Sequence, residues 1–396
     1  MGLWLIGARG SIATCVTYGL AGLRAGMIEP VGLITSAEPL AGLDLASWEE
    51  FVIGGHDVCR RDLTHSAGEL VKNGILKQEL VSASSAEAAQ FEANIRPGVL
   101  DGPDVGFADL DPRAAELGSA SPREQIAALT RDFDEFKTAH KLDRVVVVNL
   151  SSTEVFRQQD PAWESLAKLE QVLDDHESQP ASIVYAYAAL RAKCPFVNFT
   201  PNLGASIPAL IELAEEVGMP HCGNDGKTGE TLVKTALAPM FRARALKVLS
   251  WQGYNMLGNR DGAALSDPGH CESKLANKDK ALRSILDDDQ MHTHVGIDYV
   301  PSLDDWKTAW DFIHFEGFLG VKMSLQFTWA GSDSALAAPL ILDLVRLADF
   351  AAERGERGVM SQTAPFFKSP LAGGSNDFHA QFAVLMEYAQ SRRSSD

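Results

Sequence analysis

The opening of the chain limits the possible fold more than any other segment of the sequence. A short apolar run, Leu3 to Ile6, leads into a glycine turn, and an amphipathic stretch from about Ile12 to Ala25 follows. Val31 to Thr35 then has the character of a second buried strand. A strand, a turn, a helix and a strand in this order predict a parallel sheet with helices packed on its faces.

The glycine turn is also the first candidate for a functional site. Gly7 permits a tight turn, and Gly10 allows the backbone to approach a pyrophosphate at a helix N-terminus. The spacing, with Ala13 in the third position, is shifted from the usual Gly-x-Gly-x-x-Gly, and many strand-to-helix turns use glycine for geometry alone. Glu38 follows the second predicted strand and is a candidate for the ribose, although it equally fits a solvated loop. We predict dinucleotide binding through Gly7, Ala8, Arg9, Gly10, Ser11 and Ile12.

The rest of the chain suggests two domains, because 396 residues exceed one core of ordinary size. Arg144 to Leu150 is the clearest strand, and Phe196 to Phe199 is another. The stretch 82–112 precedes both of these strands and is rich in Ser, Ala, Pro, Gly and Asp. We predict that it is a surface excursion within the first domain. Beyond about Gly223, apolar runs alternate with polar turns and predict a second sheet, for example at Lys247 to Trp251 and Val321 to Trp329. Two final helices, about 335–354 and 378–390, are expected to return to the first domain.

Composition excludes some classes of partner. The chain has 35 Lys and Arg against 53 Asp and Glu, a formal net charge of -18, so it has no general electrostatic reason to bind nucleic acid or an anionic membrane. The five scattered cysteines fit a reducing compartment, and no apolar run reaches membrane-spanning length, so we expect a cytoplasmic protein. A phosphorylated ligand would require local positive charge, which makes unpaired lysines informative.

One segment, Gly223 to Thr231, contains Gly-Lys-Thr but does not fit the phosphate-binding Walker A pattern, because His221 stands where that pattern needs glycine. Its hydroxyls at Thr228 and Thr231 and its accessible backbone N–H groups still suit a phosphate. A turn followed by a helix cap would use the same residue types, and composition alone favours that alternative slightly.

Four lysines are candidates for a positive site. Lys274 and Lys278 share one face of a predicted helix and have no carboxylate at helical spacing. Lys307 and Lys368 each follow an aromatic residue, which can hold the lysine stem and limit its hydration, so both are candidates for proton transfer. For each of these lysines taken singly, an exposed surface position is the more common alternative.

Three acids accompany them. Asp225 lies in the Gly-Lys-Thr segment, Asp261 in a turn, and Asp333 directly before a helix. Turn chemistry accounts for Asp261 and an N-cap for Asp333 without any catalytic role.

Taken together, four segments resemble the inositol-3-phosphate synthase (myo-inositol-1-phosphate synthase) family, in its shorter archaeal and bacterial branch. They are Gly223 to Thr231, Tyr254 to Gly262, Glu272 to Lys278, and Phe366 to Pro370. The resemblance implies an α/β fold, with a Rossmann-type NAD-binding domain interrupted by an α+β catalytic and tetramerisation domain. The expected domains are 1–222 with 335–396 for NAD, and 223–334 for catalysis and oligomerisation.

The resemblance also implies an activity, the isomerisation of D-glucose 6-phosphate to 1D-myo-inositol 3-phosphate, the first step of inositol biosynthesis. NAD oxidises C5, enolisation at C6 and an intramolecular aldol closure onto C1 follow, and the NADH formed reduces the ring ketone. A cytoplasmic homotetramer is expected. A sugar-phosphate dehydrogenase that uses NAD(P) and releases the reduced cofactor is the alternative, and an inactive NAD-binding regulator is a third hypothesis.

The site residues follow from the resemblance. Proton transfer at the oxidised hydroxyl is assigned to Lys274, and the other lysines bind phosphate or stabilise the enolate and aldehyde oxygens. The predicted catalytic residues are Lys274, Lys278, Lys307, Lys368, Asp225 and Asp333; the substrate contacts are Thr228, Gly229, Glu230, Thr231 and Asn255; and further NAD contacts are Asn149, Ser151, Ser152, Thr153 and Asp225. A divalent metal ion is a possible second cofactor, with Asp261 as its ligand.

Overall fold

A seven-stranded parallel sheet forms the centre of the computed structural model, which describes residues 1–100, 109–155, 157–258, 282–288 and 290–393. The strand order is β11-β6-β5-β4-β1-β2-β3. Its strands are β1 (Gly2–Ile6), β2 (Val52–Asp57), β3 (Ile95–Pro97), β4 (Val145–Asn149), β5 (Phe196–Asn198), β6 (Pro220–Cys222) and β11 (Gly358–Val359). This order reverses direction between β1 and β4, as in the Rossmann fold. The predicted parallel sheet is confirmed.

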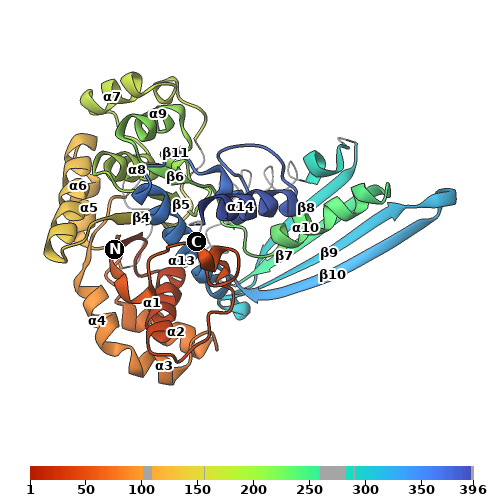
Figure 1. Cartoon of the computed structure of the whole chain (residues 1–396), viewed down its shortest axis with the longest axis horizontal. Coiled ribbons are helices and arrows are strands. Elements are labelled where there is room, and N and C mark those ends of the chain that lie inside the picture. Colours follow the sequence, from red (N-terminus) through yellow and green to blue (C-terminus); the bar gives the residue numbers. More distant parts are fainter. Residues whose placement is uncertain (101–108, 156, 259–281, 289, 394–396) are drawn as a thin grey trace.

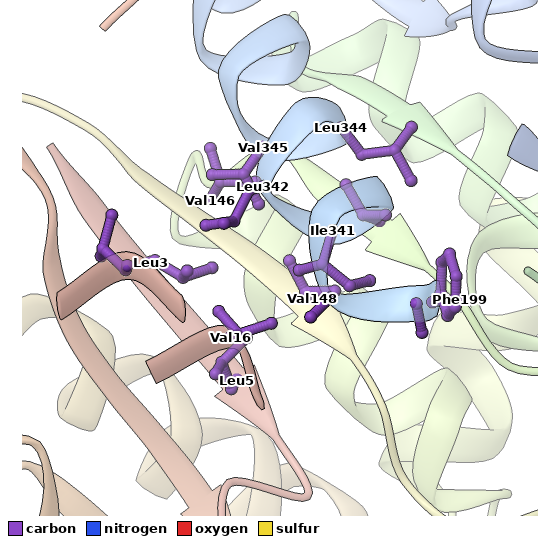
Figure 2. Close-up of a cluster of buried hydrophobic side chains, with 14 of the residues drawn as sticks. Leu3, Leu5, Val16, Val146, Val148, Phe199, Ile341, Leu342, Leu344 and Val345 are labelled. Atoms are coloured by element: carbon purple, nitrogen blue, oxygen red, sulfur yellow. The ribbon is translucent and has the colours of Figure 1, made fainter. Parts of the chain in front are cut away.

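Helices cover both faces of this sheet (Figure 1). On one face lie α1 (Ser11–Arg24), α2 (Leu63–Lys72), α3 (Gln78–Ala83), α4 (Ser85–Ala93) and α13 (Asp333–Glu353); around the other lie α5 (Pro112–Gly118), α6 (Pro122–Ala139), α7 (Leu166–Asp174), α8 (Ala181–Arg191) and α9 (Pro208–Val217). Alternation along β1 explains the two layers, because Leu3 and Leu5 enter one apolar core while Trp4 and Ile6 enter the other. Figure 2 shows the first core, where Val146 and Val148 of β4 meet Ile341 and Val345 of α13.

A second sheet of four strands extends away from the first one in Figure 1. Its order is β10-β9-β7-β8, made of β7 (Lys247–Leu257), β8 (His292–Tyr299), β9 (Trp306–Glu316) and β10 (Lys322–Ser332). The β7–β9 and β9–β10 pairs are antiparallel and the β7–β8 pair is parallel. One face packs on α10 (Glu230–Ala243) through residues such as Phe241, Trp251 and Ile313. The predicted second sheet is therefore present.

The predicted strand at Val31 to Thr35 is wrong. Gly32 has a φ of +85°, Val31 is 85% exposed, and a short 3-10 helix, η1 (Ile34–Ser36), follows. The backbone N–H groups of Ile34 and Thr35 donate to the Asp343 carboxylate of α13 at 2.9 and 3.0 Å, so they are not available to a sheet. The second strand of the sheet is β2, about 20 residues later.

The predicted surface excursion at 82–112 is also wrong in part. Residues 85–93 form α4, whose Ala88 and Phe91 are buried, and Ile95–Pro97 pairs with β2 as the edge strand β3. Alanine-rich polar composition resembles that of a loop, but alanine is the strongest helix former. Residues 85–97 thus complete the sheet instead of leaving it.

The end of the chain returns to the first sheet. Helix α13 packs against α1 and the core of β4, and β11 pairs with β6. The last helix, α14 (Phe378–Arg392), contacts α10, where His379 Nε2 lies 3.3 Å from the Ala236 carbonyl oxygen. Both predicted helices are present, whereas the exact domain boundaries stay a prediction. Within the described ranges, no helix is both long enough and apolar enough to cross a membrane.

Candidate active site

The glycine turn lies where the sheet reverses direction, at the carboxyl end of β1. Gly7 has a φ of +83°, and a Cβ there would stand 2.9 Å from the Leu150 carbonyl oxygen, so only glycine fits this turn. Gly10 is the N-cap of α1 and provides no capping side chain, so the first amides of the helix can face an anion. The His56 carbonyl oxygen of β2 accepts the N–H groups of Gly7 and Ala8 at 2.9 and 3.1 Å. These features fit the pyrophosphate of a dinucleotide.

An acid that the sequence analysis missed ends β2 beside this turn. The Asp57 carboxylate accepts the backbone N–H groups of Arg9 at 2.7 Å and Cys59 at 2.8 Å, and the residue is 8% exposed. Burial raises the pKa of Asp57, although the two hydrogen bonds act in the opposite direction. An acid at the end of the second strand is the usual partner of the ribose hydroxyls of NAD. The sequence offered only a weak signal, because the apolar run Phe51–Ile53 is short and two glycines and His56 separate it from this acid.

The alternative ribose partner, Glu38, lies elsewhere. Its side chain is 71% exposed and is paired with Arg393, next to the end of α14. Of the two hypotheses for Glu38, the structure supports the solvated loop position.

A network of amide side chains lies across the switch point from Asp57, at the ends of β4 and β5. Asn149 Oδ1 accepts the Ser151 N–H at 3.1 Å, and Asn149 Nδ2 donates to Asn198 Oδ1 at 3.2 Å. Asn202 Nδ2 donates to Ser151 Oγ at 3.2 Å and to the Ser152 carbonyl oxygen at 3.0 Å. Asn149 and Asn198 are fully buried, so these bonds define the shape of the loop. The predicted contacts Asn149, Ser151, Ser152 and Thr153 all lie at this edge.

The same network reaches the Gly-Lys-Thr segment. Asn198 Nδ2 donates to Asn224 Oδ1 at 3.0 Å. Asn224 also pairs with Ser369, its N–H donating to the Ser369 carbonyl oxygen at 2.9 Å. One buried asparagine thus connects the predicted cofactor loop to the predicted catalytic segment.

The Gly-Lys-Thr segment pairs with the segment that carries Lys368 in a short antiparallel arrangement. The Lys368 N–H donates to the Asp225 carbonyl oxygen at 2.7 Å, and the Lys227 N–H donates to the Phe366 carbonyl oxygen at 2.8 Å. Asp225 and Lys368 are therefore opposite each other, and Lys368 Nζ lies 2.8 Å from Asp225 Oδ1. This pairing brings together two predicted catalytic residues.

A second lysine–aspartate pair lies beside the first one. Lys307 Nζ, on β9, is 3.5 Å from Asp333 Oδ2, and Thr228 Oγ1 donates to Asp333 Oδ1 at 3.0 Å. Burial alone would raise the pKa of Asp333, but the charges of Lys307 and Lys368 and the Thr228 hydrogen bond hold it below its usual value. Asp333 is thus an anion among cations, and the N-cap role belongs to Ser332. Two ammonium groups converge here inside an acidic protein.

The N-terminus of α10 forms a third part of the site. Its N-cap is Gly229, which has no capping side chain, and Thr228 and Thr231 flank it. The hydroxyl oxygen of Thr231 and Oδ1 of Asn255 are buried, and within the described part of the chain neither has a hydrogen-bond partner. Such atoms are suited to a polar ligand or to water.

The side chain of Glu230 has a different environment. It lies 2.5 Å from Lys234 Nζ and accepts a hydrogen bond from Asn255 Nδ2 at 2.8 Å. Lys234 also lies 3.2 Å from Asp311, and burial raises the pKa of Asp311. Because two anions repel, a contact of Glu230 with phosphate would use its backbone N–H and not its carboxylate. The sequence analysis did not foresee this buried charged cluster.

Three predicted residues cannot be compared with the structure. Lys274, Lys278 and Asp261 lie outside the described residues. In the remaining ranges, no group of three or more His, Cys, Asp or Glu side chains is arranged to hold a metal ion.

The fold and the site together define a class. A parallel sheet with the Rossmann strand order, a glycine turn at its switch point and an acid after its second strand is typical of dinucleotide-binding proteins. The neighbouring cluster of lysines and aspartates suits an anionic substrate.

The comparisons with known proteins give the family. The family model described as myo-inositol-1-phosphate synthase, which is also named as NAD-binding, matches residues 1–390. The chain therefore belongs to the myo-inositol-1-phosphate synthase family.

Individual relatives agree with this family. The chain is 32% identical to inositol-3-phosphate synthase 1 of Bacteroides thetaiotaomicron, over 96% of this chain and 91% of that protein. It is 33% identical to inositol-3-phosphate synthase 1 of Populus euphratica, over 64% of this chain and about half, 52%, of the plant protein. The crystal structure of inositol-3-phosphate synthase from Caenorhabditis elegans has a TM-score of 0.88 and 23% identity, and covers 100% of this chain and 86% of that one. The last comparison supports the fold.

Proposed function

We propose that this protein is an inositol-3-phosphate synthase, which converts D-glucose 6-phosphate to 1D-myo-inositol 3-phosphate without net oxidation or reduction. The observation that carries the proposal is the pair of ion pairs, Lys368–Asp225 and Lys307–Asp333, next to the glycine-capped start of α10. The B. thetaiotaomicron relative carries the name of this activity and matches 96% of the chain.

NAD is the cofactor of the proposed reaction. Its pyrophosphate would lie at the start of α1, and its adenine ribose would face Asp57. The predicted contacts of the loop after β4 would hold its other half. Bound NAD supplies a transient oxidation of the sugar and the later reduction that reverses it.

The residues of the chain then have distinct tasks. Backbone N–H groups at the N-terminus of α10, with the hydroxyls of Thr228 and Thr231, would hold the substrate phosphate. The ammonium groups of Lys307 and Lys368 would stabilise the oxygens on which negative charge develops during enolisation and aldol closure. Asp225 and Asp333 orient these ammonium groups through the Lys368–Asp225 and Lys307–Asp333 ion pairs.

Lys274 and Lys278 belong to the proposal through the family resemblance. Lys274 would transfer the proton at the oxidised hydroxyl, and replacing it with alanine should abolish synthesis while NAD binding persists. The homotetramer, the cytoplasmic location and the divalent ion near Asp261 are proposals on the same basis. Chelation of divalent ions before the assay tests the last of these.

One assay separates this function from a dehydrogenase. The purified protein is incubated with glucose 6-phosphate and NAD, and inositol phosphate and NADH are both measured over time. Inositol phosphate that accumulates over many turnovers without equivalent NADH supports the synthase. NADH that accumulates in proportion to a sugar product would instead establish the dehydrogenase, and binding of NAD without any product would establish the regulator.

A further inference from the structure

A buried carboxylate that has no role in the proposed reaction lies two residues before Lys307. Asp305 is 5% exposed and belongs to the turn that leads into β9. Its Oδ2 accepts a hydrogen bond from Ser332 Oγ at 2.6 Å, and its Oδ1 accepts one from Ser334 Oγ at 2.8 Å. The two oxygens of one side chain thus hold the two residues that flank Asp333.

The pairing of β9 with β10 positions Lys307 but ends before Asp333. Lys307 is opposite Gly331, and Trp306 with Ser332 forms the last pair of the two strands. Asp333 is the first residue of α13, so strand pairing does not fix it. Its Oδ2 nevertheless lies 3.5 Å from Lys307 Nζ. Contacts outside the paired strands therefore set the direction in which the chain leaves β10.

Asp305 supplies contacts of this kind. Its two hydrogen bonds connect the strand that carries Lys307 to the junction of β10 and α13. Ser332 Oγ also accepts the N–H of Ala335 at 3.1 Å as the N-cap of α13, so its own proton is available to Asp305. Ser332 and Ser334 are 5% and 3% exposed, and without the carboxylate both hydroxyls would lose their acceptor inside the protein.

The chemistry of a carboxylate matches this task. An ionised carboxylate has acceptor capacity for both hydroxyls, whereas an amide has one acceptor oxygen and an NH₂ group that only donates. Burial raises the pKa of Asp305, the hydrogen bonds from Ser332 and Ser334 lower it, and the charge of Asp333 raises it. Replacement of Asp305 by asparagine therefore retains the size of the side chain and breaks at least one of the two contacts.

We propose that Asp305 is a positioning residue for the Lys307–Asp333 ion pair. By holding Ser332 and Ser334, it keeps the Asp333 carboxylate opposite Lys307 at the point where strand pairing has ended. This inference rests on the proposed function only where activity is the measurement, since the environment of Lys307 can be followed without substrate.

The first test measures Lys307 in the NAD-loaded protein without substrate. Brief acetylation with acetic anhydride at constant pH, followed by peptide mass spectrometry, compares the reactivity of Lys307 with that of Lys322, at the exposed start of β10. Asp305→Asn and Ser334→Ala should each raise this ratio by about 10-fold, because the lost hydrogen bond to a charged group releases Asp333 from Lys307.

Two comparisons separate positioning from a general loss of structure. Lys368 has its own carboxylate partner and should keep its reactivity in both variants. Ser324→Ala, at an exposed position on β10, is the matched control and should leave Lys307 unchanged. If Asp305→Asn does not fold, Ser334→Ala decides alone, since it deletes one hydroxyl without a change of charge. Unchanged reactivity of Lys307 in the folded variants, or an equal increase at Lys368, would overturn the inference.

Activity gives a second measurement. In both variants kcat for inositol phosphate should fall by about 10–100-fold, because a displacement of about 1 Å at a reacting group has an effect of this size. KM for glucose 6-phosphate should stay nearly constant, since the start of α10 would hold the phosphate. The double variant Asp305→Asn, Ser334→Ala should retain the defect of the single variants without multiplying it, as expected for one interaction.

The kinetic outcomes also distinguish this inference from the proposed function. A raised KM with unchanged kcat would contradict the positioning role, because the defect would then lie in substrate binding. A wild-type protein that makes no inositol phosphate would refute the proposed function, whereas the labelling of Lys307 would still decide this inference.

Discussion

At the residue scale, the site consists of charges that are stable only because they are paired. Lys307 and Lys368 each contact one aspartate, and Thr228 adds a hydrogen bond to Asp333. Unpaired burial of such groups would cost several kcal/mol, of the order that shifts pKa values by several units. The pairs therefore place cations in a partly buried site without a large loss of stability, and they leave these cations available to a substrate.

Lys307 offers the most direct test of this arrangement. Lys307→Ala should lower kcat by about 10²–10³-fold, because one ammonium group that stabilises developing oxyanion charge is lost. Steady-state formation of inositol phosphate measures the effect. Lys322→Ala, at the exposed start of β10, serves as the matched control. Equal activity of the two variants would remove Lys307 from the proposed mechanism.

Asp57 determines a second prediction at this scale. Asp57→Asn should weaken NAD binding by about 10–100-fold, since a charge-assisted hydrogen bond contributes about 1.5–3 kcal/mol. Titration of NAD by calorimetry measures the dissociation constant without any turnover. The same change at Asp44, an exposed acid, should have no effect. Unaltered affinity in Asp57→Asn would mean that the ribose has another partner.

At the element scale, α13 connects distant parts of the chain. Asp343, near the middle of this helix, is fully buried and accepts the Thr35 hydroxyl at 2.6 Å as well as two backbone N–H groups. Arg346, one turn later, donates to Thr35 Oγ1 at 2.8 Å and to the Ala46 carbonyl oxygen at 2.9 Å. The helix thereby fixes the segment between α1 and β2, which has no strand of its own.

This contact makes stability depend on pH. Burial raises the pKa of Asp343 to about 6, although the hydrogen bonds from Thr35 and Ile34 oppose the rise. In the unfolded chain the carboxyl group titrates near about pH 3.9. The folded state therefore binds more protons between these values, and the free energy of unfolding falls as the pH rises through this window, by about 3 kcal/mol in total.

Replacement of the carboxyl group isolates the effect. Asp343→Asn should reduce the slope of the free energy of unfolding between about pH 4 and 6, measured by urea denaturation at a series of pH values. Glu353→Gln, at the end of the same helix, should retain the wild-type slope. A parallel pH dependence in wild type and Asp343→Asn would contradict the assignment.

At the scale of the whole molecule, the second sheet has one covered face and one open face. The open face carries a row of aromatic side chains across neighbouring strands, in which the rings of Tyr254 and Trp310 are 5.9 Å apart and stacked. Phe312 and His314 continue the row along β9, and Tyr254 and Trp310 are 38% and 37% exposed. Contiguous exposed apolar surface of this kind is typical of an interface, which supports the proposed homotetramer.

The oligomeric state provides the corresponding prediction. Trp310→Glu should convert the assembly to smaller species, because a charge would be buried in the contact between copies. Light scattering coupled to size exclusion measures the mass, and circular dichroism checks that the fold is retained. Val384→Glu, at an exposed position on α14, should leave the mass unchanged. A monomeric wild type would exclude this interface.

Structural features that depend on neighbouring residues could be predicted from the sequence, whereas features that depend on distant contacts could not. The first strand, the glycine turn, α1 and the valine strand were predictable from local signals. Both strands are continuous apolar runs that are buried throughout, and glycine is required by a local backbone angle. Val31 to Thr35 has equally apolar composition, but its fate depends on Asp343, more than 300 residues away. Local periodicity contains no information about such a partner.

The candidate site shows the same division. The sequence by itself determined which residue types were present: a glycine turn, a Gly-Lys-Thr segment, and a pair of lysines, Lys274 and Lys278, without a carboxylate at helical spacing. Only the tertiary structure decided that Lys368 meets Asp225, 143 residues apart, and that Asp57 ends the true second strand. It also placed Lys227 against α14. Pairing of distant charges depends on strand register and helix packing, which the whole fold determines and no short segment encodes.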